Sequence, residues 1–176
     1  MFKRKNKVKN PNDEGRAYDY AVYLLSLHLR TTGELRQKLQ EKGYSQQVIS
    51  STLDDLTSQR YLDDQRYAEV FLDNLKKYKN FGYYGIKKKL IEKRLPSEII
   101  ENVLADGLSV DEEIKIAKRL LIKEGVGVKS SAGDVAQAPG LLYTTYDEAK
   151  SKRNQKTSQR LKARGFRGDV IARLVL

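Results

Sequence analysis

The sequence predicts an all-α fold of tandem three-helix repeats, with three units that form an elongated, curved helical protein. A pattern that begins at Leu39 and returns at Leu90 and Leu161 carries this prediction. In each copy a leucine ends one helix, a base and a short apolar turn follow, and paired β-branched residues begin the next helix. Stacked repeats bury their apolar faces on their neighbours and present long surfaces rather than closed pockets, which favours a binding protein.

The first repeat is predicted to take residues 15–60. Its second helix should begin with a capping box between Thr31 and Glu34 and end at Gly43 with φ above zero, and Ser45 should cap its third helix. The expected inner faces are Tyr18, Ala21, Leu24, Leu25 and His28 on the first helix and Val48, Ile49, Thr52, Leu53 and Leu56 on the third.

The second repeat is predicted to take residues 61–107, with Asp63 as the cap of a long first helix. Ile86 and Leu90 stand where the second helix of the first repeat has two leucines. The expected inner faces are Tyr67, Val70, Phe71, Asn74 or Leu75, and Tyr78 on the long helix and Ile99, Ile100, Val103 and Leu104 on the third.

The third repeat is predicted to take residues 108–176, beginning with a capping box at Ser109. Its spacing differs, because an extended loop rich in Gly, Ser and Ala is inserted at about 125–143. Thr157 stands where the other repeats have Leu35 and Ile86, so we expect this repeat to be the least stable. The expected inner face of its first helix is Ile114, Ala117, Leu120 and Leu121.

Composition limits the classes of protein that fit this chain. Residues 1–14 are predicted to be a disordered basic arm, because charges and an Asn-Pro-Asn-Asp cluster leave little to bury. The absence of cysteine excludes disulfides and thiolate metal sites, and it fits a reducing, cytoplasmic location. The most apolar stretch, residues 20–29, is about half the length that a membrane span needs, so we expect no membrane association. A monomer is expected.

The net charge of +11 is sorted along the chain. Residues 76–94 hold eight bases and one acid, and residues 150–167 hold eight bases and no acid. Sorted charge builds a local potential that attracts polyanions, whereas a solvated helix face is the ordinary alternative. The predicted basic binding faces are Lys76, Lys77, Lys87, Lys88, Lys89, Lys93, Arg94, Lys152, Arg153, Lys156, Arg160, Lys162, Arg164 and Arg167.

Two neighbouring aromatic residues are candidates for stacking on nucleobases. Tyr83 and Tyr84 are flanked by bases, and such rings can stack on single-stranded nucleic acid. Packing between repeats explains them equally well. Lys152, Lys156 and Arg160 recur at four-residue spacing and, with Arg153, should form one cationic stripe that suits phosphates or an acidic protein wall.

Catalytic and metal chemistry find little support, so we expect no enzyme, no cofactor and no metal site. The single histidine, His28, lies in a leucine-rich helix and is expected in the core or at its boundary. Asp63 is expected to cap a helix, and Asp54 and Asp55 are expected to face solvent. The stretch 125–131 lacks the glycine and lysine spacing of a phosphate-binding loop.

Four segments resemble the RecX family of bacterial recombination regulators. Residues 61–68 are similar to the family's aromatic-Leu/Ile-Asp-Asp/Glu-x-Arg-Phe/Tyr-Ala signature. The segments at 34–44, 82–93 and 164–171 resemble signatures of its first, second and third repeats, in the family's order. Two departures are Arg94, in place of a usual glycine, and the insertion at about 125–143.

The resemblance implies a regulator that binds RecA on single-stranded DNA and lies in the groove of the RecA filament. It implies that the protein mostly inhibits the recombinase and co-protease activities of RecA in recombination and SOS DNA repair. The alternative is a stand-alone DNA-binding protein with helix-turn-helix-like units, although the third helices carry acidic and neutral residues instead of base-reading ones. A scaffold with no DNA role is a third option.

Overall fold

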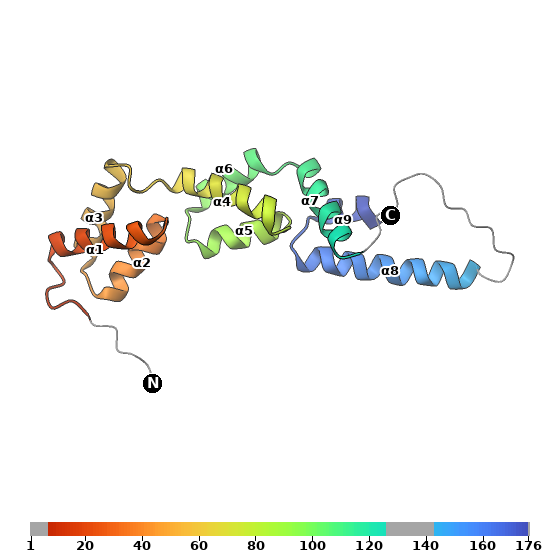
Figure 1. Ribbon diagram of the computed structural model, residues 1–176, viewed down its shortest axis with the longest axis horizontal. Helices are drawn as coiled ribbons and strands as arrows, with labels where there is room; N and C mark the ends of the chain where they lie inside the picture. The colour runs from red at the N-terminus through yellow and green to blue at the C-terminus, as the bar shows by residue number, and fades with distance from the viewer. Residues whose placement is uncertain (1–6, 126–142, 176) are drawn as a thin grey trace, which may run out of the picture. The chain divides into compact units, whose positions relative to one another are not determined.

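A computed structural model describes residues 7–125 and 143–175, and the side chains in the second range are described from Lys150 onward. All regular structure in these ranges is α-helical, which confirms the predicted fold class (Figure 1). The predicted insertion at about 125–143 lies almost wholly outside them. The helices are α1 Glu14–Leu27, α2 Thr32–Lys42, α3 Gln46–Ser58, α4 Asp64–Tyr78, α5 Tyr83–Glu92, α6 Ser97–Gly107, α7 Val110–Lys123, α8 Tyr143–Ala163 and α9 Gly168–Val175.

The chain divides into two compact units, which we describe one at a time. Unit 1 consists of Met1–Phe71 and Lys89–Val103, and unit 2 consists of Leu72–Lys88 and Leu104–Leu176. The division therefore falls inside α4, α5 and α6, and each unit holds one end of these three helices. The predicted repeat boundaries at residues 60 and 107 remain a prediction.

The core of unit 1 follows the helical spacing of its apolar residues. On α3 the whole expected inner face is buried, and on α1 the buried residues are Ala17, Ala21 and Leu24. His28 corrects the prediction, because α1 ends one residue before it and its side chain is exposed. Tyr18 and Leu25 pack at the edge of the core, partly buried.

The predicted inner face of α4 is confirmed at Leu75 and wrong at Val70 and Tyr78. Ala68, Leu72 and Leu75 are buried, whereas Val70 and Tyr78 are exposed. Tyr67 and Phe71 are half-buried, with ring centroids 5.8 Å apart. The small Ala68 holds a fully buried position that the predicted face did not include. The aromatic rings cover much area without being fully buried.

The inner face of α7 differs from the prediction in one informative respect. Ala117, Leu120 and Leu121 are buried as expected, but Ile116 replaces Ile114 and Glu113 is fully buried at 0% exposure. A buried carboxylate must receive hydrogen bonds to offset its lost hydration. The partners of Glu113 lie in unit 2.

Three turns of equivalent sequence share one backbone conformation. The residue after the C-terminal turn of α2, α5 and α8 is Gly43, Arg94 and Gly165, with φ of 101°, 56° and 76°. The expectation that Gly43 has φ above zero is confirmed. A left-handed residue ends each helix and turns the chain sharply into the next one. Arg94 does the same with a side chain that this region disfavours.

In unit 1, the N-terminus of α2 docks on the turn between α5 and α6; we call this contact the α2 junction. The predicted capping box is present, with Thr31 accepting from the Glu34 amide at 3.0 Å. The Thr31 hydroxyl also donates to the Lys93 carbonyl at 2.6 Å, and the Thr32 amide donates to the Asp64 carboxylate at 2.8 Å. Of the orphan amides at the helix start, that of Thr32 is thus satisfied by a neighbouring segment and that of Glu34 by the capping Thr31.

In unit 2, the N-terminus of α5 docks on the turn between α8 and α9, and we call this contact the α5 junction. The Gly82 amide donates to the Arg164 carbonyl at 3.1 Å, and the Tyr84 amide donates to the Gly165 carbonyl at 2.8 Å. The Tyr83 amide donates to the buried Glu113 carboxylate at 3.0 Å. Both junctions therefore join a helix N-terminus to a turn carbonyl and to a carboxylate.

The start of the chain is held on unit 1 for as far as it is described. Residues 1–6 of the predicted disordered arm lie outside the described ranges. The Val8 amide donates to the Lys42 carbonyl at 3.0 Å, and the Ser45 amide donates to the Pro11 carbonyl at 2.9 Å. Asp13 accepts from the Arg16 amide at 3.0 Å and caps α1. Ser45 is the N-cap residue of α3, but its side chain makes no capping hydrogen bond.

Replacing Gly85 with alanine should destabilise the protein, because a Cβ there would lie 2.3 Å from the Arg164 carbonyl oxygen. We expect Gly85→Ala to lower the free energy of unfolding by about 1–3 kcal/mol, since the backbone of the α5 junction must move apart. Urea unfolding followed by circular dichroism measures this change.

Gly168→Ala is the matched control, because it also lies in a helix and a Cβ there meets nothing within 4 Å. It should be neutral or raise the free energy of unfolding by up to about 1 kcal/mol, as alanine favours helix. Equal effects of the two changes would contradict the close approach at the α5 junction.

Candidate functional site

The exposed flank of α8 carries the predicted cationic stripe. Thr157 and Leu161 are buried, while Lys152, Lys156 and Arg160 lie at four-residue spacing and are exposed. Because residues four apart share a helix face, these three side chains form one row on a flank of α8. Within the described residues, the charge pair on this row joins Arg160 to Glu124 at 3.9 Å, which is a long contact. Two of the three ammonium and guanidinium groups therefore have no carboxylate within salt-bridge distance among the described residues.

Other predicted binding cations are engaged inside the fold. Lys93 donates to Glu34 at 3.0 Å and lies 5.7 Å from the Phe71 ring. Arg167 pairs with the buried Glu113 through its Nε and through its backbone amide. Such cations contribute to the junctions and have less charge to offer a ligand.

The remaining predicted cations differ in their surroundings. Lys89 pairs with Glu92 at 2.7 Å, and the Arg164 guanidinium lies 5.7 Å from the Phe81 ring. Lys87 is half-buried. The exposed members of the set, besides the α8 row, are Lys77, Lys88, Arg94, Arg153 and Lys162.

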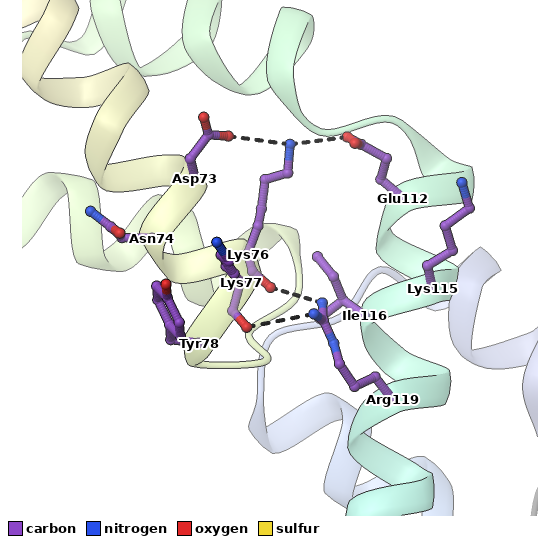
Figure 2. Close-up of a pocket in the computed structure, with 9 residues that line it drawn as sticks. All are labelled: Asp73, Asn74, Lys76, Lys77, Tyr78, Glu112, Lys115, Ile116 and Arg119. Atoms are coloured by element: carbon purple, nitrogen blue, oxygen red, sulfur yellow. Dashed lines mark hydrogen bonds and ion pairs between the residues drawn. The ribbon is translucent and has the colours of Figure 1, made fainter.

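A second cationic region lies in unit 2, where the C-terminal end of α4 and the first half of α7 line an open cleft of about 710 Å³ (Figure 2). Lys76 is held on one side of it, between Glu112 at 3.3 Å and Asp73 at 3.6 Å, and it donates to the Gly107 carbonyl. Its charge is therefore neutralised. Arg119 donates to the carbonyls of Lys76 and Lys77, which end α4.

The cleft is also lined by two further cations and an exposed aromatic ring. Tyr78 is 62% exposed, and the Lys77 ammonium lies 5.4 Å from its ring. Lys115 is exposed, and no carboxylate partner for it is found among the described residues. Lys77 and Tyr78 lie on α4, whereas Lys115 lies on α7, across the cleft (Figure 2). The Tyr78 ring can stack on an aromatic group while the Lys77 ammonium beside it contacts a phosphate.

The sequence missed Lys115 and Arg119 as members of this region. Both lie on α7, where Asp111, Glu112 and Glu113 cancel their charge in any count along the chain. Helical geometry removes Glu113 from this count, because Glu113 turns inward while Glu112, Lys115 and Arg119 line the cleft. A count made for each helix face, rather than along the chain, is the signal that would have found them.

The two candidate stacking tyrosines have different environments. Tyr83 is half-buried, with the Arg167 guanidinium 5.1 Å from its ring, so it belongs to the α5 junction. Tyr84 is 60% exposed and meets the edge of the Tyr83 ring at 5.3 Å. Only Tyr84 of this pair presents a large exposed ring surface.

Two pKa shifts follow from the α2 junction. Burial raises the pKa of the Asp64 carboxyl, and the hydrogen bonds from Thr32 act in the opposite direction without cancelling the effect. Burial disfavours the charged form of Lys93, but hydrogen bonds and charges from Glu34 and Tyr67 outweigh it and raise the pKa of its ammonium. Lys93 thus stays charged as part of the fold.

The described residues contain neither a metal-binding cluster nor a membrane-spanning helix. No group of three or more His, Asp or Glu side chains that could hold a metal ion occurs in residues 7–125 and 150–175. Within the part of the chain that the structure describes, no helix has the length and apolar character needed to cross a bilayer.

Comparisons with known proteins give consistent results. A family model of the first three-helix domain of RecX matches residues 17–56, and a model of its second three-helix domain matches residues 63–104. The regulatory protein RecX of Trichlorobacter lovleyi is 26% identical over 163 residues, which cover 93% of this chain and 96% of the relative. The regulatory protein RecX of Halalkalibacterium halodurans is 28% identical over 89% of this chain but only 52% of its own length.

Solved structures agree at the level of the fold. The crystal structure of RecX from Lactobacillus salivarius superposes with a TM-score of 0.74 at 22% identity, over 93% of this chain and 94% of that one. A second crystal structure of a regulatory protein RecX gives 0.71 at 22% identity, over 92% of this chain and 72% of that one.

Removing the buried carboxylate of the α5 junction should be costly. Glu113→Ala leaves the Tyr83 and Arg167 amides and the Arg167 guanidinium without their acceptor. We expect the free energy of unfolding to fall by about 3 kcal/mol or more, because breaking a buried ion pair strands its partner. Urea unfolding measures the loss.

Glu112→Ala is the control on the neighbouring residue, whose carboxylate is partly exposed and pairs with Lys76. Its effect should stay within about 1 kcal/mol, as for other exposed ion pairs. A loss for Glu113→Ala no larger than that of the control would contradict the structural role of Glu113.

Proposed function

Because this chain belongs to the RecX family of regulatory proteins, we propose that it binds the RecA filament on single-stranded DNA and lowers recombinase and co-protease activity. In this proposal the protein lies along the filament and takes no part in bond-making chemistry. Recombination and SOS DNA repair in the cytoplasm are the processes it would regulate.

The observation that carries the proposal is the exposed cationic row of α8. Lys152 and Lys156 have no carboxylate within salt-bridge distance among the described residues, so their charge is available to a ligand. An acidic protein wall and a DNA phosphate backbone are the two ligands that such a row suits. A RecA filament on DNA offers both.

The cleft of unit 2 supports a second point of contact. Lys77 presents its ammonium group beside the exposed ring of Tyr78, and Lys115 lines the same cleft from α7 (Figure 2). Cations and rings together favour a single-stranded nucleic acid, whose bases are free to stack. Direct contact with DNA is therefore part of the proposal, in addition to contact with RecA.

Sequence-specific reading of duplex DNA is the alternative, and the third helices of the three-helix domains argue against it. Asp54, Glu98 and Glu101 are exposed on α3 and α6. Exposed carboxylates would face the phosphates of a groove, whereas base reading uses Arg, Asn or Gln at these positions. The exposed charges therefore favour binding to the backbone over reading of bases.

Adding the protein to a cognate RecA filament should lower its DNA-dependent ATP hydrolysis. The loss should grow as the protein is raised to equal molar amounts with RecA, because each bound molecule occupies part of the filament. A coupled ATPase assay at moderate salt measures it, and repressor cleavage measures the co-protease activity. Unchanged rates in both assays at an excess of the protein would contradict the proposed function.

Removing two cations of the α8 row should weaken filament binding through its electrostatic part. For Lys152→Ala with Lys156→Ala, the slope of log affinity against log salt should fall by roughly one to one and a half, if both contact phosphates. Fluorescence anisotropy of labelled RecA filaments over a salt series measures the slope. Circular dichroism should remain unchanged, because both side chains are exposed.

The matched control is Lys38→Ala with Lys42→Ala, which removes the same charge from α2. Lys38 already pairs with Glu41 at 3.2 Å, and Lys42 lies 5.2 Å from the Tyr20 ring. Its salt slope should equal that of the unmodified protein. Equal slopes for all three proteins would remove the α8 row from the binding mechanism.

A further inference from the structure

In the two junctions the accepting backbone carbonyls belong to residues at equivalent positions of the repeats. The turn after α5 presents the Lys93 carbonyl to Thr31, and the turn after α8 presents the Arg164 carbonyl to Gly82. In both cases the next residue is left-handed, which points the carbonyl away from its own helix. The third turn of this type, after α2, presents the Lys42 carbonyl.

In the described residues, no helix precedes α1, so no helix N-terminus is there to donate to the Lys42 carbonyl. The N-terminal segment takes this place instead, because the Val8 amide donates to the Lys42 carbonyl at 3.0 Å. This bond has the same acceptor position as the bonds from Thr31 and Gly82 and nearly the same length as that from Gly82, 3.1 Å.

A second hydrogen bond repeats the comparison three residues further on. At the α5 junction the Arg167 amide donates to the Glu113 carboxylate at 2.9 Å. The equivalent Ser45 amide donates to the Pro11 carbonyl at the same distance, 2.9 Å. The main-chain carbonyl of Pro11 therefore accepts a hydrogen bond from the residue before α3, as the carboxylate of Glu113 accepts one from the residue before α9. Pro96 stands at the third equivalent position and has no amide hydrogen to satisfy.

Side chains of the segment also cover this turn. Val8 is partly buried and packs against the core of unit 1. The Lys7 stem lies 3.6 Å from the place where a Cβ on Gly43 would be. The segment thus supplies a donor, an acceptor and an apolar cover.

We propose that the turn from Lys42 to Ser45 is a docking surface of the same design as the two junctions, and that residues 7–12 are its occupant. These residues, which we call the N-terminal cap, take the place of a preceding repeat and close the series of repeats at its first end. Terminal units of repeat proteins need such a cap, because their outer face is otherwise left without a neighbour.

At the other end of the series, the chain closes differently. The residues of α8 equivalent to Thr31 and Gly82 lie within a continuous helix that begins at Tyr143, so no free helix N-terminus occurs there. The Thr157 hydroxyl donates to the Arg153 carbonyl at 2.9 Å, within the same helix. A junction of the α2 or α5 type cannot form at this place.

Val8→Pro in the full chain tests the cap, because proline removes the amide that donates to Lys42. Val8→Ala is the control, since it keeps the amide and loses only part of the apolar contact. The readout is amide hydrogen exchange at Ser45, compared with the Arg167 amide of the α5 junction in the same sample.

We expect the Ser45 amide to exchange at least about tenfold faster in Val8→Pro than in the unmodified protein, because the cap detaches and its Pro11 carbonyl leaves. Val8→Ala should change this rate much less, and the Arg167 amide should exchange at the same rate in all three proteins. Equal Ser45 rates in Val8→Pro and the unmodified protein would overturn the proposal. So would equal acceleration at Ser45 and Arg167, since that reports general unfolding.

Discussion

The rest of the structure depends on one kind of interaction: a hydrogen bond from the start of one helix to the backbone carbonyl of a turn that follows another helix. A helix N-terminus leaves amides without partners, and a left-handed residue leaves a carbonyl pointing away from its helix. The Lys93 carbonyl accepts a hydrogen bond from the Thr31 hydroxyl, and the Arg164 carbonyl accepts one from the Gly82 amide. At the α5 junction the turn carbonyl thus satisfies a backbone amide, at the α2 junction it accepts from a capping hydroxyl, and each compact unit contains one such contact.

Local signals in the sequence were enough for the helix ends but not for every helix face. The capping box at Thr31 and the left-handed Gly43 depend only on neighbouring residues, so the sequence predicted them. The face of α4 depends on what packs against it, and there the fully buried Ala68 was not predicted. The burial of Glu113 could not be predicted either, because its partners lie 30 and 54 residues away in sequence.

The charged residues show the same limit. Counting bases along the chain located the two basic blocks, but it could not separate cations that act in the fold from cations that face solvent. Arg167 and Lys93 belong to the junctions, whereas Lys152 and Lys156 are exposed. The cleft with Lys115 was missed because the neighbouring acids of α7, one of them the buried Glu113, cancelled its charge in a count along the chain. A partner across the fold, and not the residue type, decides the role of each cation.

The composition of the junctions has a consequence for how such chains can diverge. At the α5 junction the turn carbonyls of Arg164 and Gly165 accept hydrogen bonds from backbone amides, and a Cβ on Gly82 or Gly85 would lie too close to the opposing chain. The side chains that take part in the junctions, among them Thr31, Asp64 and Glu113, are distinct from the exposed cations of α8. Drift in amino-acid identity can therefore alter the exposed faces freely while the geometry between successive helices is inherited intact, so surface chemistry and architecture are able to evolve independently.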